Sequence, residues 1–359
     1  MQAGCAHEAA FAVAGPGQRP PRDSGAYVQV TFNPGVDLAP AWLSDGGGFL
    51  YSAQQIDRGD DDRCLVLQPS GGGAITRILC HETASSADSL DVWENAAVGT
   101  TGELAFVWST TPIGLGSRTP SWQGFVLGSV DHPEPVRVLK TLPYLAPSGA
   151  GHEGISHVSW LDPTTLVYLG EHVAQINDDI IATGIEVARM DVQTTPPTLM
   201  IVPGTDSASS VTARGTDTIY YTRNGDTRVY RRGLSTGAVD TVADFGGAIV
   251  RDVQVAGSRL VAVVGGKVDY FIDSAAGPTQ HDRGGYLHLL DLVSGHDTVL
   301  PPPPGGLRWY RHPALSPDGS RIVAEGHHVD LIDRYVEGVF VGTDTIIDPA
   351  DDLWRLDLP

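Results

Sequence analysis

Residues 313–323 read PALSPDGSRIV, and this short stretch decides the fold. Two apolar runs flank a central Pro-Asp-Gly. Proline presets the φ angle required at an early position of a tight turn, and glycine readily adopts the positive φ angle required at a later position. The stretch therefore predicts two antiparallel strands joined by a short turn.

The same pattern recurs along the chain. A weaker copy, PAWLSDG followed by FLY, covers residues 40–51. Four degenerate copies bring the total to six, at residues 97–107, 158–168, 211–221 and 253–263. A second strand pair follows each copy, as in YLHLLDL at 286–292. Each repeat thus holds about four strands in about 55 residues, somewhat longer than a typical propeller blade.

The length and composition agree with a repeat fold. Chains longer than roughly 250 residues usually divide into domains, unless the fold adds small packed units in series. With 359 residues, this chain exceeds that size. Helical periodicity is almost absent, and the 43 glycines and 25 prolines interrupt nearly every longer window, which excludes helix bundles and Rossmann folds. A β-sandwich competes, but it explains neither the six copies nor their regular turns. We predict one all-β domain over residues 26–359, a six-bladed β-propeller with four-stranded antiparallel blades.

The two ends of the chain predict how the ring closes. The last repeat offers only three strands and ends in DLWRLDL at 352–358. A spare strand, AYVQVTF, stands before the first repeat at 26–32. Pairing of the two segments would complete the last blade and remove an exposed edge. We expect this closure.

The net charge limits the partners. A formal charge of −20 argues against nucleic acid, because phosphate binding needs clustered Lys and Arg. Acidity otherwise favours solubility and, weakly, cationic ligands. No run of 18 apolar residues is present, so no transmembrane segment is expected.

The cysteines suggest export. Cys64 and Cys80 flank a turn centred on Gly72, so a hairpin there would place them opposite each other, at a separation that suits a disulfide. Two buried free thiols are the alternative. A disulfide indicates an oxidising compartment, which for a bacterial protein means the periplasm or the cell surface. MQAGC at 1–5 resembles the end of a lipoprotein signal with Cys5 as the lipidated residue, or else residues 1–25 are an ordinary disordered tether.

PALSPDGSRIV at 313–323, with DLWRLD at 352–357, resembles the Pro-Asp-Gly repeat of TolB-like six-bladed propellers. The resemblance extends over most of the chain after residue 26, although the four inner copies depart at the turn. It implies a periplasmic or secreted interaction platform without a shared activity. Similar blades form the lid of prolyl oligopeptidase-like enzymes, whose hydrolase domain we do not expect here.

One face of the predicted ring carries the functional signal. In a blade with strands a to d, the b–c loops and the d–a connections share a face, and here they are long and irregular. Loops above about 12 residues are often functional. The long segments are 54–62, 109–121, 171–184, 265–284 and 327–351.

Polar residues at the starts of innermost strands are the first candidate site. His157, Asp252, His312 and Asn95 occupy comparable positions and are expected to line the central channel, either as a binding site or as ordinary hydrogen-bonded channel residues. His152 and His157 do not form a zinc-protease motif, because the spacing is one residue too long for His-Glu-x-x-His and a strand points them to opposite sides.

The long loops supply further candidates. His328 and Asp330, next to His327, would join His281 and Asp282 if two loops converge, a set that suits Zn²⁺ or acid–base chemistry. The acidic run 57–62 would suit Ca²⁺ or is simply solvated. Loop aromatics would stack on sugars or anchor a protein, although most are expected to pack between blades. They are Trp93, Trp122, Tyr270, Trp309, Tyr310 and Tyr335.

Three functions remain open at this point. The first is a non-enzymatic, monomeric binding module that takes a protein or glycan on the loop face. The second is a hydrolase or lyase with a His–Asp or metal site over the channel, acting on a carbohydrate or lactone. Convergence of His157, His312 and His328 on one cavity would favour it. The third is a structural domain of a larger assembly, since fold does not fix function.

Overall fold

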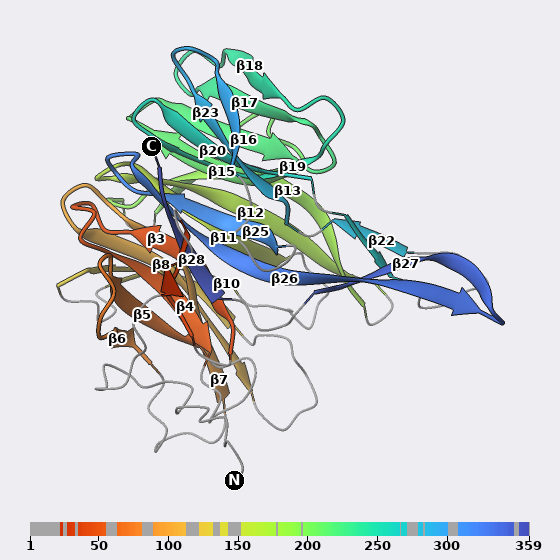
Figure 1. Cartoon of the computed structure of the whole chain (residues 1–359). Coiled ribbons are helices and arrows are strands. Elements are labelled where there is room, and N and C mark those ends of the chain that lie inside the picture. The colour runs from red at the N-terminus through yellow and green to blue at the C-terminus, as the bar shows by residue number, and fades with distance from the viewer. Residues whose placement is uncertain are drawn as a thin grey trace, which may run out of the picture.

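The computed structural model describes residues 22–23, 27–32, 35–54, 63–80, 89–112, 122–131, 137–142, 152–176, 179–194, 197–265, 267–270, 279–282, 284–300, 308–347 and 352–358. All regular elements in these ranges are β-strands, and no helix occurs among them. The strands form antiparallel sheets arranged like the blades of a propeller (Figure 1). The prediction of an all-β chain is confirmed.

Three sheets hold four strands each, consecutive along the chain apart from one insertion. One contains β11 (His152–Asp162), β12 (Thr165–Ile176), β13 (Asp179–Asp191) and β14 (Thr198–Ile201). The next contains β15 (Ala208–Arg214), β16 (Thr218–Arg223), β17 (Arg228–Gly233) and β18 (Val239–Asp244). The third contains β19 (Val250–Ala256), β20 (Arg259–Val264), β23 (Tyr286–Asp291) and β24 (Asp297–Leu300). The insertion is a separate ribbon of β21 (Lys267–Tyr270) and β22 (Thr279–Asp282).

The N-terminal strands form an eight-stranded sheet made of two such runs. The first run is β3 (Asp37–Trp42), β4 (Gly48–Gln54), β5 (Arg63–Pro69) and β6 (Thr76–Leu79). The second is β7 (Ser89–Val98), β8 (Glu103–Pro112), β9 (Trp122–Ser129) and β10 (Arg137–Leu142). A single parallel pair, Arg63 with Val92, joins them. The sheets are therefore not the six separate four-stranded sheets that the sequence predicted.

The last sheet brings the two ends of the chain together. It runs from β25 (Arg308–Leu315) through β26 (Arg321–Val336) and β28 (Asp352–Asp357) to β2 (Tyr27–Gln29) and β1 (Arg22–Asp23). Tyr27 lies opposite Leu356 in the β2–β28 ladder, as the spare-strand argument predicted. Figure 1 shows the dark-blue β28 beside the red and orange strands of the N-terminal sheet.

All six repeat segments of the sequence are antiparallel hairpins: β3–β4, β7–β8, β11–β12, β15–β16, β19–β20 and β25–β26. The Pro-Asp-Gly turn of the last one is tight. The Gly319 amide donates to the Ser316 carbonyl at 2.8 Å, and Gly319 has a φ of 70° that favours glycine. The first strand of each hairpin contacts the first strand of the next, and β25 contacts β3.

Some segments predicted to be long irregular loops are ladders instead. β12 and β13 continue past the sheet and pair as far as Ile176 with Asp179. β26 likewise continues and pairs with β27 (Val339–Ile347) around a two-residue turn. Both turn residues, Glu337 and Gly338, have positive φ, which matches the twist of a hairpin. The prediction of irregular loops was wrong at these two places, because apolar residues on both sides of a short turn can pair, and also at 265–284, where β21 pairs with β22.

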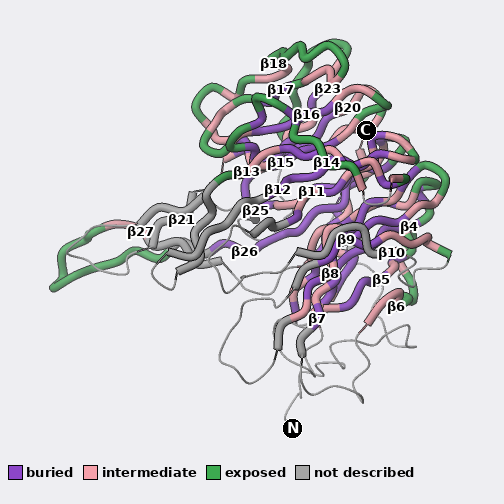
Figure 2. The backbone as a smooth tube through the Cα atoms, turned by 180° about the vertical axis from the view of Figure 1, so that it is seen from behind, coloured by how far each residue is buried: buried purple, intermediate pink, exposed green. Residues whose placement is uncertain are grey.

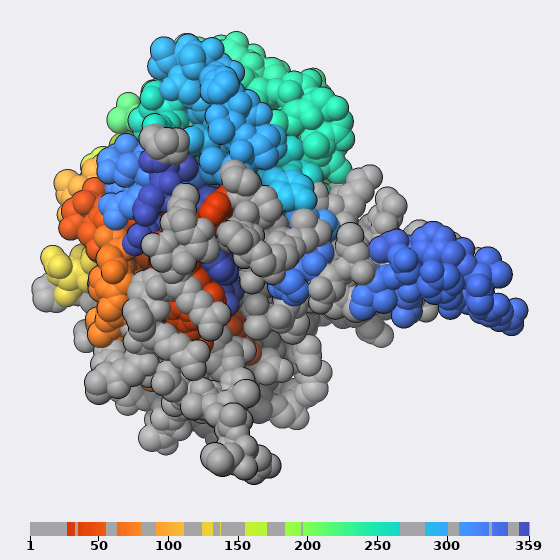
Figure 3. All heavy atoms as spheres, in the orientation of Figure 1, coloured from red at the N-terminus to blue at the C-terminus, as the bar shows by residue number. Residues whose placement is uncertain are grey.

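The β26–β27 hairpin projects from the body as an arm, blue in Figure 1 and in the space-filling view of Figure 3. Its outer part is exposed (Figure 2) and carries large apolar side chains. Tyr335 is 62% exposed, Val339 65% and Phe340 54%. A surface of this kind is a feature of interaction sites.

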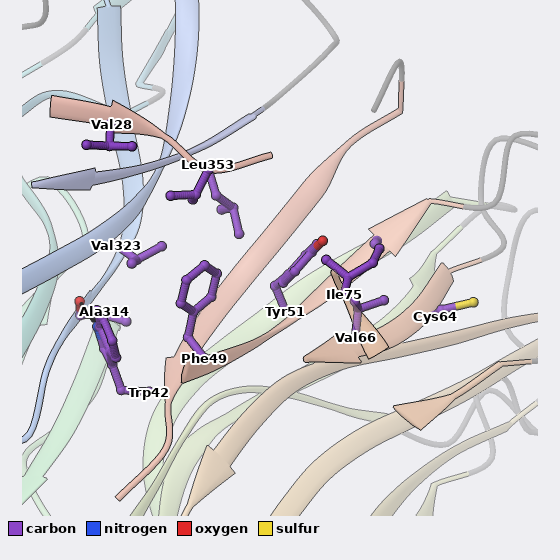
Figure 4. Close-up of a cluster of buried hydrophobic side chains, with 12 residues drawn as sticks. Val28, Trp42, Phe49, Tyr51, Cys64, Val66, Ile75, Ala314, Val323 and Leu353 are labelled. Atoms are coloured by element: carbon purple, nitrogen blue, oxygen red, sulfur yellow. Dashed lines mark hydrogen bonds between the residues drawn. The ribbon is translucent and has the colours of Figure 1, made fainter. Parts of the chain in front are cut away.

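The core lies between the sheets and joins the two ends of the chain. Figure 4 shows one cluster in which Val28 and Leu353 of the terminal strands lie near Phe49 of the first hairpin. Phe49 is fully buried, and its ring meets Trp42 at 5.6 Å. The Trp42 indole donates to the Ala314 carbonyl at 3.0 Å, so the first and last hairpins share both apolar contact and a hydrogen bond.

The predicted disulfide is present. Cys64 and Cys80 are bonded across the β5–β6 hairpin with a Cα–Cα distance of 4.6 Å. Cys5 lies outside the described residues. In the described part of the chain, no helix is long and apolar enough to cross a membrane.

We predict that removal of this disulfide lowers the free energy of unfolding by about 3 kcal/mol, because a loop of about this size restricts the unfolded chain. Urea unfolding of the double variant C64A/C80A measures the loss. Wild-type protein under reducing conditions is the control and should unfold like the variant. Equal stability of oxidised and reduced wild type would contradict the prediction.

Candidate functional site

A bulge interrupts the innermost strand of every hairpin. The ladder skips one or two residues in β3, β7, β11, β15, β19 and β25. In four of these strands the skipped residues begin with a non-glycine at positive φ: Ala39 (51°), Asn95 (52°), His157 (50°) and His312 (41°). Bulges re-aim side chains, and backbone of this kind costs about 1–3 kcal/mol per residue. Three of these four residues, Asn95, His157 and His312, were predicted from the sequence to line the channel.

Three of the predicted channel residues meet there. His157 Nε2 lies 2.7 Å from Asp252 Oδ1, although the two residues stand on β11 and β19. The backbone amide of His312, on β25, donates to Asp252 Oδ2 at 3.1 Å. The two imidazole rings lie 5.6 Å apart. Asp252 thus joins three strands from three sheets.

A fourth residue, Glu325 of β26, lies behind His312. His312 Nδ1 is 2.6 Å from Glu325 Oε1, which also accepts the Ala39 amide at 2.6 Å. Glu325 is fully buried. Burial of a charge is costly unless it is paired and hydrogen-bonded, and this carboxylate has both kinds of partner.

Arg311 and His327 continue the network on the other side of Glu325. Arg311 Nε lies 3.5 Å from Glu325 Oε2 and donates to His327 Nε2 at 2.7 Å. The guanidinium has donors and no acceptor, so His327 accepts through this nitrogen. His327 is buried and belongs to the support of the site.

The electrostatics follow from this chain of contacts. Burial opposes ionisation of His312, but the Glu325 and Asp252 charges outweigh it and raise its pKa from 6.5 to about 9. Burial also opposes ionisation of Asp252, yet the His312 charge and the hydrogen bond from His157 hold the pKa of this carboxyl well below its usual range. The pKa of Glu325 is likewise lowered, against its burial, by His312. Near neutral pH the cluster therefore holds a cation between two carboxylates.

Open space lies next to the cluster. A hollow of about 300 Å³ is lined by His157, Asp252 and His312 together with polar groups that include Arg251, Arg311, Ser209 and Asn224. A second hollow of about 50 Å³ shares the same three residues and adds Asn95 and Ala39. A ligand in either hollow would contact the cluster.

None of the loop candidates is part of the cluster formed by the described side chains, which do not include that of Asp330. His328 and Asp330 lie farther along β26, in register with Arg308 and Ile346. His281 and Asp282 lie on β22, whose partner strand β21 contacts β27, and their side chains are outside the described residues. The convergence expected of His157, His312 and His328 thus holds for the first two residues, with Asp252 as the third.

The aromatic candidates divide by burial. Trp309 is only 7% exposed, and Trp93 and Tyr310 are also buried, as expected for rings between sheets. Tyr335, on the β26–β27 arm, is exposed. The side chains of Trp122 and Tyr270 and the acidic run 57–62 lie outside the described residues.

The sequence analysis missed Glu325, although a signal was available. In RIVAEGH, residues 321–327, a lone carboxylate interrupts an otherwise apolar strand, and alternation places it on the same side as Val323 and His327. A charged residue at a core position needs a partner. The partner, His312, stands on the neighbouring strand of the same hairpin.

One serine motif has no catalytic context. Residues 233–237 read GLSTG, a match to Gly-x-Ser-x-Gly. They form the exposed turn between β17 and β18, where Ser235 Oγ donates to Asp217 at 2.7 Å. A nucleophile elbow needs a strand followed by a helix, so this match is fortuitous.

The raised pKa of His312 predicts a pH dependence of stability. His312 contributes fully below its ordinary pKa of 6.5, and its contribution is lost as the pH rises through about 9, because the folded state then holds a proton that the unfolded state does not. Urea unfolding of wild type and H312Q in chelator-containing buffer should give a stability difference that shrinks over this range. A difference that stays constant from below pH 6.5 to above pH 9 would contradict the assignment.

Comparisons with known proteins support the fold class but assign no family or activity. No known family profile matches the sequence, and no curated protein matches it. Among solved structures, TolB from Acinetobacter baumannii superposes with a TM-score of 0.50 at 14% identity, over 86% of this chain and 66% of that one. The chain therefore spans just under two thirds of that TolB chain.

A second solved structure is similar over nearly its whole length. XC5397 from Xanthomonas campestris, described as a gluconolactonase, superposes with a TM-score of 0.52 at 13% identity, covering 95% of both chains. At such low identity these likenesses establish architecture alone. The chain is similar to β-propeller proteins.

Proposed function

We propose that this chain is a propeller enzyme that acts on a small carbohydrate or lactone, as a hydrolase or lyase, at the centre of its ring. The observation that carries the proposal is the position of Asp252, which contacts His157 at 2.7 Å and the His312 amide at 3.1 Å beside an open hollow. Charged groups with opposed pKa shifts in a cavity are typical of functional sites.

The proposal includes a ring of six TolB-like blades of the Pro-Asp-Gly type. Three observations support it: the six hairpins, the contacts of their first strands in cyclic order, and the β2–β28 pairing that adds a fourth strand to the last blade. Arg321 beside the last turn also donates to the Gly46 carbonyl of the first turn at 3.0 Å. A closed ring places all six bulges around one channel.

The lining of the larger hollow supports the substrate class. Arg251 and Arg311 offer positive charge, and Ser209 and Asn224 offer hydrogen bonds to hydroxyl groups. Arg251 is held in place by hydrogen bonds from its Nε to the carbonyls of Gly265 and Gly284. The volume, about 300 Å³, is at the lower end of ligand pockets. A sugar acid or its lactone fits these features, and the gluconolactonase neighbour makes lactones the first class to test.

The disulfide supports export to the periplasm or cell surface, because such bonds persist in oxidising compartments. Lipid attachment at Cys5 and a monomeric state belong to the same proposal. A net charge of −20 agrees with a role that does not involve nucleic acid.

A protein- or glycan-binding module is the second candidate, and the β26–β27 arm favours it. Tyr335 and Phe340 lie in register near its end with their rings 5.7 Å apart, and both are exposed. Exposed aromatic residues are frequent anchors in interfaces. The two roles are compatible, since the arm projects from the body that contains the channel.

We predict that wild-type protein turns over at least one member of a panel of aldonolactones and uronate oligosaccharides, and that D252N lowers kcat/KM by about 100-fold or more. The loss follows because Asp252 holds the His157 imidazole and the backbone amide of His312 in place. Lactone opening is measured as acid release, and lyase activity as ultraviolet absorbance of the unsaturated product.

H288N is the matched control. His288 Nδ1 also pairs with a carboxylate, Asp297 at 2.9 Å, but on outer strands away from the channel. Its activity should equal that of wild type. If D252N turns over substrate as wild type does, the reaction does not take place at the Asp252 cluster. If no member of the panel is turned over, the binding module becomes the better candidate.

A further inference from the structure

We infer that His157, Asp252 and His312 bind one divalent transition-metal ion of the zinc class at the centre of the channel. The inference rests on the proposed function and deepens it, because a metal there would be the group that polarises the substrate or a water molecule. It follows from five features of the described residues: donor spacing, donor type, outer support, strained backbone and open positions.

The spacing comes first. One donor atom from each of the three side chains lies within 4.8 Å of the other two. Ligands about 2.0–2.2 Å from a tetrahedral zinc ion lie roughly 3.4 Å from one another, so side-chain rotations would have to bring these donor atoms closer together on binding. Within the described ranges, this is the one group of three His, Cys, Asp or Glu side chains whose donor atoms lie this close to one another.

The donor type selects the metal. Two imidazoles and one carboxylate suit Zn²⁺ and neighbouring transition metals. Ca²⁺ takes six to eight oxygen ligands, and this cluster offers one carboxylate. Of the two metals suggested by the sequence, Zn²⁺ therefore fits this site and Ca²⁺ does not.

The groups that hydrogen-bond to the three ligand residues, here called the outer support, are arranged as expected around a metal ion. Metal-binding histidines usually donate their second ring nitrogen to a carboxylate, which fixes the ring and its tautomer. Glu325 Oε1 holds His312 Nδ1 at 2.6 Å and so leaves Nε2 as the ligand atom. Asp252 is oriented by the His312 amide, and Ser156 Oγ lies 3.2 Å from His157 Nδ1.

The strained backbone points the same way. His157 and His312 both have positive φ, at 50° and 41°, in equivalent bulges of β11 and β25. Such conformations persist when the surrounding structure holds them, and they gather at functional sites. Here the strain aims two imidazoles from different sheets at one carboxylate.

Coordination would remain incomplete with three protein ligands. Both hollows border the cluster, and the His157 and His312 side chains are 16% and 36% exposed. Open positions distinguish a reactive metal site from a closed structural one. A hydroxyl or carbonyl oxygen of a substrate in the larger hollow could complete the coordination.

The test uses the untagged full chain after chelator treatment and dialysis. Isothermal titration with Zn²⁺ should give one site, and Co²⁺ should give the visible absorption of a low-coordinate nitrogen and oxygen environment. H312A and D252A should remove both signals. E325Q should weaken Zn²⁺ binding by about 10- to 100-fold, since it alters only the outer support. H288A, from the outer His288–Asp297 pair, should bind as wild type does.

Circular dichroism and thermal melting confirm that each variant is folded, and H157A replaces any channel variant that is not. The inference is overturned if wild type binds no stoichiometric Zn²⁺, or if folded H312A and H157A bind it as wild type does. Failure here is distinct from failure of the proposed function. Substrate turnover that persists in chelator would reject the metal and keep the enzyme, whereas one bound Zn²⁺ without turnover would keep the metal and reject the enzyme.

Discussion

A buried carboxylate holds the centre of this molecule together. Glu325 accepts hydrogen bonds from the Ala39 amide and from the His312 ring, which stand on β3 and β25, the innermost strands of the first and last hairpins. An unpaired charge at this depth would cost several kcal/mol, so these strands must meet with their donors in place. The Ala39 contact joins residues 286 positions apart in the chain. The same carboxylate that satisfies this constraint keeps His312 charged.

The candidate site is a consequence of that charge and of the bulges. The charge of His312 lowers the pKa of Asp252, and Asp252 in turn holds His157 from a third sheet. In a regular strand, each side chain would point to one of the two faces of its own sheet. The bulges of β11 and β25 turn both histidines towards one point, at the cost of positive φ angles. Strain and buried charge are therefore found together, as is usual where a fold is specialised for chemistry.

Much of the fold could be predicted because its signals are local. Turn chemistry in Pro317 to Gly319 fixes a hairpin by itself, and the symmetric spacing of Cys64 and Cys80 about Gly72 fixes their register. The β2–β28 pairing followed from a strand count. His157, Asp252 and His312 could be named from their equivalent positions, because each directly precedes a repeat segment, at 158–168, 253–263 and 313–323.

The remaining features depend on contacts that span the chain. No local pattern states that Glu325 meets Ala39, or that three separate strands bring His157, Asp252 and His312 within one another's reach. The β26–β27 arm lies in segment 327–351, which was predicted as a loop, and its turn carries Glu337, a residue type that does not signal positive φ. The loop candidates His281, Asp282 and Asp330 were chosen by residue type and by their place on long segments, and their side chains lie outside the described residues.

The central claim is that Glu325 holds His312 as a cation against Asp252. Nitrogen-15 NMR of histidine-labelled, metal-free protein near neutral pH tests it most directly, with His312 assigned by comparison with H312Q. The account predicts that both ring nitrogens of His312 carry protons in wild type and that the ring becomes neutral in E325Q. A neutral His312 ring in wild type at this pH would contradict the account.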